Sequence, residues 1–154
     1  MMKSFILKIF AIQLVASVLL FLGIQQLYVL AELDLIELIH SVGKDNFAYY
    51  VQKSDEFGIS EKLKALSTTK FILSSIGIIL GYIICSIINF KKGYNWTISL
   101  VIVVLCFIVF QFKFINLPTK YFINSGLEIA YIGTSIVAII ISLLIYFYSY
   151  RAKP

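Results

Sequence analysis

The residues of this sequence that could carry out chemistry are few, and Glu37 and His40 form the most suggestive pair. Their Glu-x-x-His spacing places a carboxylate and an imidazole on one face of a helix, as in di-iron bundles. Such a centre needs a second pair and further glutamates, and a zinc site needs additional Cys or His ligands. His40 is the only histidine. We therefore expect no metal site and place His40 on the polar face of an exposed helix.

The two thiols, Cys85 and Cys106, both lie inside long apolar runs. A thiol–disulfide enzyme needs accessible cysteines, and a thiol surrounded by apolar side chains is a poor nucleophile. The sequence also has no phosphate loop, no Gly-x-Ser-x-Gly motif and no dinucleotide fingerprint. It therefore predicts no cofactor, and we interpret the cysteines as small packing residues.

The most polar residues of the first apolar run are Gln13, Ser17, Gln25 and Gln26. They could bond neighbouring helices, line a narrow pore in an oligomer, or contact a partner; bonding between helices is the favoured interpretation. The apolar runs contain no Asp, Glu, Arg or His. Ion pumps and proton-coupled carriers place ionisable groups within the membrane, so coupled transport by this chain alone is not expected.

The elements that position these residues are indicated by the composition. Sixty per cent of the 154 residues are hydrophobic and 14% are charged, against about 45–50% and about 25% in soluble domains. A water-soluble fold of this size cannot bury so much apolar side chain. The net charge of +5 comes from dispersed basic residues, mostly at the ends of apolar runs. That distribution is typical of contacts with lipid headgroups and not of nucleic-acid binding.

Four uncharged apolar runs predict an all-α integral membrane protein with four transmembrane helices in a single membrane domain, residues 1–154. Backbone amides in lipid must bond internally, and about 20 residues of helix cross a hydrocarbon core of roughly 30 Å. The predicted spans are 9–31, 71–90, 94–112 and 129–150. The third has almost no small residues, so we expect it at the periphery of the bundle.

Small residues form a stripe on each of two predicted spans. The second span carries Ser74, Gly77 and Gly81 on one face, and the fourth carries small residues at intervals of four, namely Ala130, Thr134, Ala138 and Ser142. Small side chains let helix backbones approach closely in lipid. We expect both faces to form helix–helix contacts, either within the chain or between copies.

Two loops connect the spans on one side of the predicted membrane. Residues 32–70 are predicted to form an extracytoplasmic helical segment, with stops at Gly43 and Gly58 and a last helix that is capped by Ser60 and continues into the second span. Residues 113–128 form a second outer loop. It ends in Ser125 and Glu128, whose S-x-x-E spacing predicts a capping box for the fourth span.

The charges predict the orientation. Both termini and the Lys91–Lys92 turn carry basic residues and no acidic ones, whereas all eight acids lie between Glu32 and Glu61 or at Glu128. The positive-inside rule then places both termini in the cytoplasm, with the protein in the cell membrane. The abundance of Ile, Lys, Asn, Phe and Tyr is typical of A+T-rich bacterial genomes and indicates a bacterial inner membrane.

The function favoured by the sequence is that of a non-catalytic accessory, regulatory or immunity-type subunit. Besides the lipid bilayer, its partner would be another membrane protein or a second copy, met through helix faces or the outer loop. One alternative is a channel formed by oligomers, with the first span facing the pore. The other is a membrane enzyme that uses outer carboxylates such as Glu32, Asp34 and Glu37.

Overall fold

A computed structural model describes residues 2–42, 44–112, 117 and 126–152, and every regular element in these residues is helical. The elements are α1 (Met2–Gln26), the 3-10 helix η1 (Leu27–Ala31), α2 (Leu33–Val42), α3 (Lys44–Gln52), α4 (Ser60–Lys91), α5 (Thr97–Phe112) and α6 (Leu127–Arg151).

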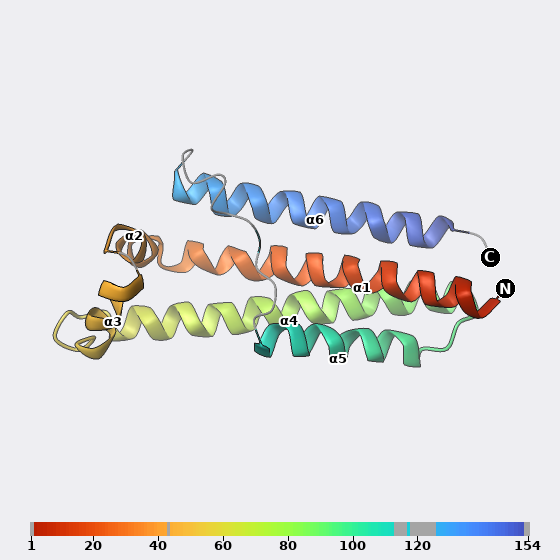
Figure 1. The fold of residues 1–154 in the computed structure, drawn as a ribbon, viewed down its shortest axis with the longest axis horizontal. Coiled ribbons are helices and arrows are strands. Elements are labelled where there is room, and N and C mark those ends of the chain that lie inside the picture. The colour runs from red at the N-terminus through yellow and green to blue at the C-terminus, as the bar shows by residue number, and fades with distance from the viewer. Residues whose placement is uncertain (1, 43, 113–116, 118–125, 153–154) are drawn as a thin grey trace.

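The long helices lie side by side in an elongated bundle (Figure 1). Helix α1 is central: it lies between α4 and α6 and packs against both, while α5 lies against α4 and α1. The start of α1, the α4–α5 turn and the end of α6 meet at one end of the bundle, which we call the terminal end. Helices α2 and α3 lie at the opposite end, the loop end.

Three helical segments are long and apolar enough to cross a membrane: Ile6–Ala31, Ser60–Lys91 and Leu127–Arg151. Helix α5 is equally apolar but has only 16 residues, which is a length of about 24 Å. The all-helical prediction is therefore confirmed in the described residues, and three of the four predicted spans coincide with helices of sufficient length.

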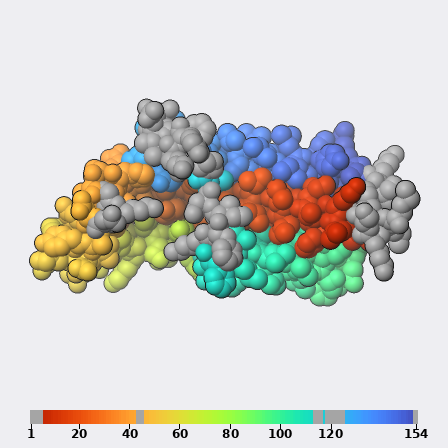
Figure 2. Space-filling model, viewed as in Figure 1, coloured from red at the N-terminus to blue at the C-terminus, as the bar shows by residue number. Residues whose placement is uncertain are grey.

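Many large apolar side chains face outward in this bundle, and polar side chains lie in the interior beside the apolar core, unlike in a soluble protein. Phe71, Ile79 and Leu144 are 57%, 57% and 61% exposed, whereas Gln13 and Ser149 are fully buried. Figure 2 shows one face of this surface, on which α1 lies open between α5 and α6. An exterior of this kind is suited to lipid, because apolar surface in water is unfavourable.

The boundaries of two spans differ from those expected. The first α-helix begins earlier, at Met2, and ends at Gln26, after which residues 27–31 tighten into a 3-10 helix, as is frequent at helix ends. The third helix begins at Thr97 and not at residue 94. Gly93 takes a positive φ of 68°, and the side chain of Asn95 accepts a hydrogen bond from the Thr97 amide at 3.2 Å, so the turn extends to Asn95.

The loop end contains the expected short helices, and α4 continues unbroken from Ser60 to Lys91 as predicted. The role of Ser60 as cap was wrong, because Ile59 occupies the cap position and makes no side-chain cap bond. The turn before it passes through Gly58 at a positive φ of 66°, and the Ile59 amide bonds the Ser54 carbonyl at 2.9 Å. Gly43 lies outside the described residues.

At the start of α6, Gly126 occupies the cap position and makes no side-chain cap bond. Glu128 is exposed in the first helical turn, where a carboxylate favours the positive end of the helix dipole. Ser125, its partner in the predicted capping box, lies outside the described residues.

A close approach between α4 and α1 predicts a sensitive position at Gly77. A Cβ atom there would lie 2.7 Å from the Cα of Phe21 on α1, whereas a Cβ at Gly133 would meet nothing within 4 Å. Gly77→Ala should therefore lower the free energy of unfolding by about 1–3 kcal/mol through overpacking. Gly133→Ala is the matched control and should leave stability unchanged or slightly raised. Thermal unfolding in mild detergent, followed by circular dichroism, measures both; equal stability of the two variants would contradict the packing described.

Candidate functional site

The polar residues of α1 point into the bundle, and each bonds a different residue of a neighbouring helix. Gln13 and Ser17 are one helical turn apart, and Gln25 and Gln26 follow two turns later. All four make side-chain hydrogen bonds to α4 or α6. This is the interhelical role that the sequence favours for them.

The first layer lies toward the terminal end and joins four helices. The Gln13 amide nitrogen donates to Asn89 Oδ1 of α4 at 2.9 Å and to Ser149 Oγ of α6 at 3.4 Å. Asn89 Nδ2 in turn donates to Ser99 Oγ of α5 at 2.9 Å. All four side chains are fully buried. The Gln13 Oε1 atom has no hydrogen-bond partner among the described residues.

The second layer, one turn further along α1, centres on Ser17. Its hydroxyl donates to the Gln13 carbonyl at 2.8 Å, so the Tyr146 hydroxyl, 2.7 Å away, is the donor in their mutual bond. Cys85 Sγ of α4 lies 3.4 Å from the same Ser17 oxygen. Gly81 leaves room for this contact, because a Cβ there would lie 3.3 Å from the Tyr146 hydroxyl oxygen.

The third layer lies toward the loop end. Gln25 Nε2 donates to Ser74 Oγ at 2.8 Å, and the Ser74 hydroxyl donates a hydrogen bond to the Lys70 carbonyl at 2.6 Å. On the other side, Gln26 bonds the Thr134 hydroxyl of α6, which donates to the Ala130 carbonyl at 2.7 Å. Each hydroxyl therefore both accepts and donates, which is the arrangement that a water-free interior requires.

The structure brings both predicted small-residue stripes against α1, and not against each other. On α4, Gly77 faces the Phe21 backbone and Ser74 accepts from Gln25. On α6, the Ser142 hydroxyl donates to the Ala16 carbonyl of α1 at 2.7 Å. The remaining members of the two stripes are also buried: Gly81, Ala130, Thr134 and Ala138.

Sequence reasoning missed several partners in this network, although the stripes contained a signal for them. The face of the second span that carries Gly81 also carries Cys85, and continuing its four-residue interval reaches Asn89. Continuing the interval of the fourth span from Ser142 reaches Tyr146. Ser99 had no such signal because α5 lacks a small-residue stripe, yet Ser99 and Cys106 are buried against the other helices.

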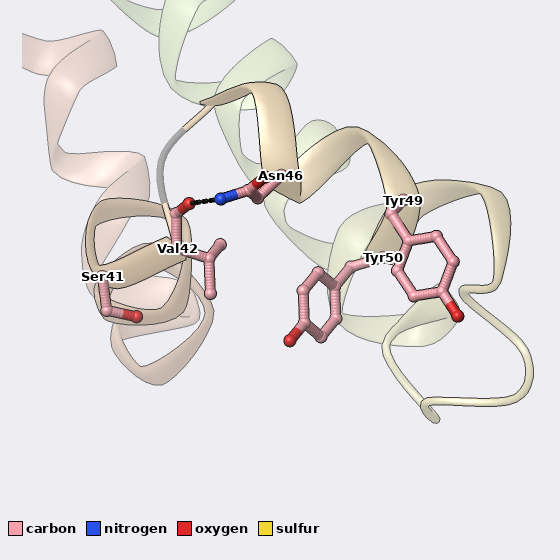
Figure 3. Close-up of a pocket in the computed structure, with 5 residues that line it drawn as sticks. All are labelled: Ser41, Val42, Asn46, Tyr49 and Tyr50. Atoms are coloured by element: carbon pink, nitrogen blue, oxygen red, sulfur yellow. Dashed lines mark hydrogen bonds between the residues drawn. The ribbon is translucent and has the colours of Figure 1, made fainter.

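A second candidate site is a pocket of about 450 Å³ at the loop end (Figure 3). Ser41 and Val42 of α2 form one wall, and Asn46, Tyr49 and Tyr50 of α3 form the other. Asn46 Nδ2 holds the two helices together by donating to the Val42 carbonyl at 2.9 Å. The lining offers hydroxyl, amide and aromatic groups, which suit binding better than catalysis.

The residues proposed for metal or carboxylate chemistry do not converge. His40 lies exposed, with its Nε2 3.3 Å from the Tyr131 hydroxyl of α6, so it connects α2 to the bundle. Asp34 pairs with Lys62 at 3.9 Å. No group of three or more His, Cys, Asp or Glu side chains in the described part of the chain could hold a metal ion.

Comparisons of the chain with protein-family models, with curated proteins and with solved structures found no match.

The terminal-end layer predicts a measurable energetic coupling between Gln13 and Asn89. Asn89→Leu should lower the free energy of unfolding by about 1–3 kcal/mol, because it leaves buried groups of Gln13 and Ser99 without partners. A double-mutant cycle with Gln13→Leu should give a coupling energy of about 0.6 kcal/mol and at most about 1.7 kcal/mol. Unfolding in detergent measures all four proteins.

Ser75→Ala serves as the control for that cycle, because among the described residues the Ser75 hydroxyl bonds the Phe71 carbonyl of its own helix, at 2.9 Å, and no other helix. Its effect on stability should be small. Additive effects of Gln13→Leu and Asn89→Leu would show that the two amides do not interact.

Proposed function

We propose that this chain is a four-span membrane protein without catalytic activity, an accessory, regulatory or immunity-type subunit that acts by contacting another protein. This proposal is supported by where the polar and the aromatic side chains of the chain lie. The polar side chains of α1 are used inside the bundle, whereas an aromatic group at the loop end remains exposed.

The fourth span is α5, and the positions of the chain ends support this assignment. Three crossings would leave the two termini on opposite sides of a membrane. The start of α1 and the end of α6 instead lie at the same end of the bundle (Figure 1), as expected if α5 returns the chain across. Its 16 residues reach about 24 Å, and its surface is apolar.

The terminal end faces the cytoplasm in this proposal. It gathers Lys91, Lys92 and Arg151 together with the basic N-terminal residues, and the sequence places no acidic residue there. Basic residues in short loops and tails favour the cytoplasmic side. The cell membrane, in bacteria the inner membrane, is the corresponding location.

The aromatic group at the loop end consists of Tyr49, Tyr50 and Phe57, and we call it the loop-end aromatic surface. The ring centroids of Tyr50 and Phe57 are 4.9 Å apart, and those of Tyr49 and Phe57 are 6.1 Å apart. Tyr49 and Phe57 are 53% and 45% exposed. Exposed tyrosine beside polar and charged side chains is typical of protein-binding surfaces.

The height of this surface argues for a protein partner and against lipid. The uncharged part of α4 begins at Phe71, and residues 60–70 extend it by about 15 Å beyond the hydrocarbon core. The headgroup layer accounts for only about 5–8 Å on each side. Helix α3 and the turn that leads into α4 lie at the loop end (Figure 1), so we place the loop-end aromatic surface in water above the headgroups.

The placement of the α1 side chains favours this function over an oligomeric pore. A pore lined by α1 would need Gln13 and Gln25 to face outward between copies. Gln13 is instead fully buried, and Gln25 bonds Ser74 within the same chain. The outer carboxylates likewise give little support to an enzyme, because Asp34 and Glu37 are exposed and neither they nor His40 line the pocket at the loop end.

The four-span topology predicts a labelling pattern for single introduced cysteines. An impermeant maleimide applied to intact cells should label Gln52→Cys and Glu128→Cys, because both positions lie at the loop end. Tyr94→Cys and Ala152→Cys should react only after the membrane is permeabilised. The unmodified chain is the control, since Cys85 and Cys106 are buried. Labelling of Ala152→Cys in intact cells, with none at Glu128→Cys, would indicate three crossings.

The contact function predicts site-specific cross-linking at Tyr49. Benzoylphenylalanine incorporated there should give an adduct of discrete mass with another protein in intact membranes. The adduct should weaken when Tyr50 and Phe57 are both replaced by serine, because the surface that holds the partner is then lost. The matched control is Ile79, which is equally exposed, at 57%, but on the apolar exterior of α4. No adduct at Tyr49, or the same adduct at both positions, would overturn the proposal.

A further inference from the structure

An apolar groove of about 550 Å³ runs along the exterior of the bundle between α1 and α6. Ala11, Ile12 and Val15 form the α1 wall, and Leu144, Ile145 and Tyr148 are among the residues of the α6 wall. The groove lies in the half of the bundle nearer the terminal end, because it follows the beginning of α1 and the end of α6. Its lining is almost entirely apolar, so its occupant in a membrane must offer an apolar chain.

A basic residue continues the α1 wall at the rim of the groove. Lys8 precedes Ala11, Ile12 and Val15 by three, four and seven residues, so it lies on the same helical face. Its side chain is exposed. From Lys8 to Val15 the helix rises about 10 Å, so the α1 wall of the groove extends about that far along the helix from this basic rim.

The α6 wall ends in the same way. Arg151 follows Tyr148 by three residues and is exposed, with its guanidinium carbon 4.3 Å from the centre of the Phe147 ring. Tyr148, which is 64% exposed and lines the groove, adds a hydroxyl donor one helical turn before the arginine. No carboxylate side chain is encoded before Glu32 or after Glu128. Lys8 and Arg151 therefore have no acidic side chain of this chain on their own side.

We propose that this groove is a binding site for an anionic phospholipid. One acyl chain lies along the apolar walls, and the phosphate lies at the rim, where Lys8, Arg151 and the Tyr148 hydroxyl can bind it. The apolar walls match the acyl chain of such a lipid, and the two cations at the end of the walls match its phosphate. This inference depends on insertion of the chain in a bilayer, and it is independent of the contact at the loop-end aromatic surface.

The charges also argue against a second copy of the chain as the occupant. Copies inserted in the same orientation hold their terminal ends at the same depth. Packing two of these grooves together would bring Lys8 and Arg151 of each copy against those of the other. Like charges facing each other oppose such contacts, whereas a lipid phosphate neutralises them.

Native mass spectrometry of the full chain in detergent tests the site, with phosphatidylglycerol and phosphatidylcholine of identical acyl chains as probes. One phosphatidylglycerol per chain should be retained in preference to phosphatidylcholine. Lys8→Gln and Arg151→Gln should each weaken retention about fivefold, as expected for one basic residue near an anionic lipid. Ala11→Phe, which fills the groove without changing charge, should also weaken it.

Two matched variants distinguish binding at this groove from general attraction of anionic lipid to the basic terminal end. Lys91→Gln removes one charge at the terminal end but from α4, and Ile79→Phe adds an aromatic side chain on the exterior of α4; neither should change retention. Equal retention of the two lipids would overturn the proposal. So would an effect of Lys91→Gln as large as that of Lys8→Gln, or no effect of Ala11→Phe. A dimer that Ala11→Phe dissociates would assign the groove to a second copy instead.

Discussion

The structure depends on one constraint, which is that a polar group away from water must find its partner within the protein. Helix α1 has the polar side chains and the central position, so α4, α5 and α6 each supply groups that bond it or its partners. In lipid, apolar burial gives little drive for helix association, and close packing with hydrogen bonding takes its place. Helix α1 shows both contributions at different positions along its length. Its Phe21 backbone packs closely against Gly77, and its Gln13 side chain bonds Asn89.

Much of the fold could be predicted from the sequence because lipid restricts a chain so strongly. Uninterrupted apolar runs could only be helices, and the intervals of small residues marked the faces that α4 and α6 turn toward their neighbour. Sequence could not identify that neighbour as α1, since the same stripes would serve contacts between copies. It also missed Asn89, Ser99 and Ser149, because single polar residues near the end of an apolar run resemble ordinary boundary residues.

Helix ends were predicted less well than helices, for local reasons. Ser60 has the right side chain for a cap, but the bonds of the preceding turn, through Gly58 and Ile59, start the helix one residue earlier. Asn95, which precedes α5, does accept from the Thr97 amide, although the absence of charge at residues 93–95 suggested a longer helix. Turn geometry set by a single positive φ therefore decided both boundaries.

The short length of α5 has a consequence for the surrounding membrane. At about 24 Å, it falls about 6 Å short of an average hydrocarbon core. In the proposed four-span arrangement, a span of that length would compress the bilayer beside α5 but not beside the longer α4 and α6, at a fraction of a kcal/mol for each ångström. The lipid around the protein would then be thinned on one side only. Such strain would favour residence in thin membranes and contact between the α5 side and a neighbour with an equally short span.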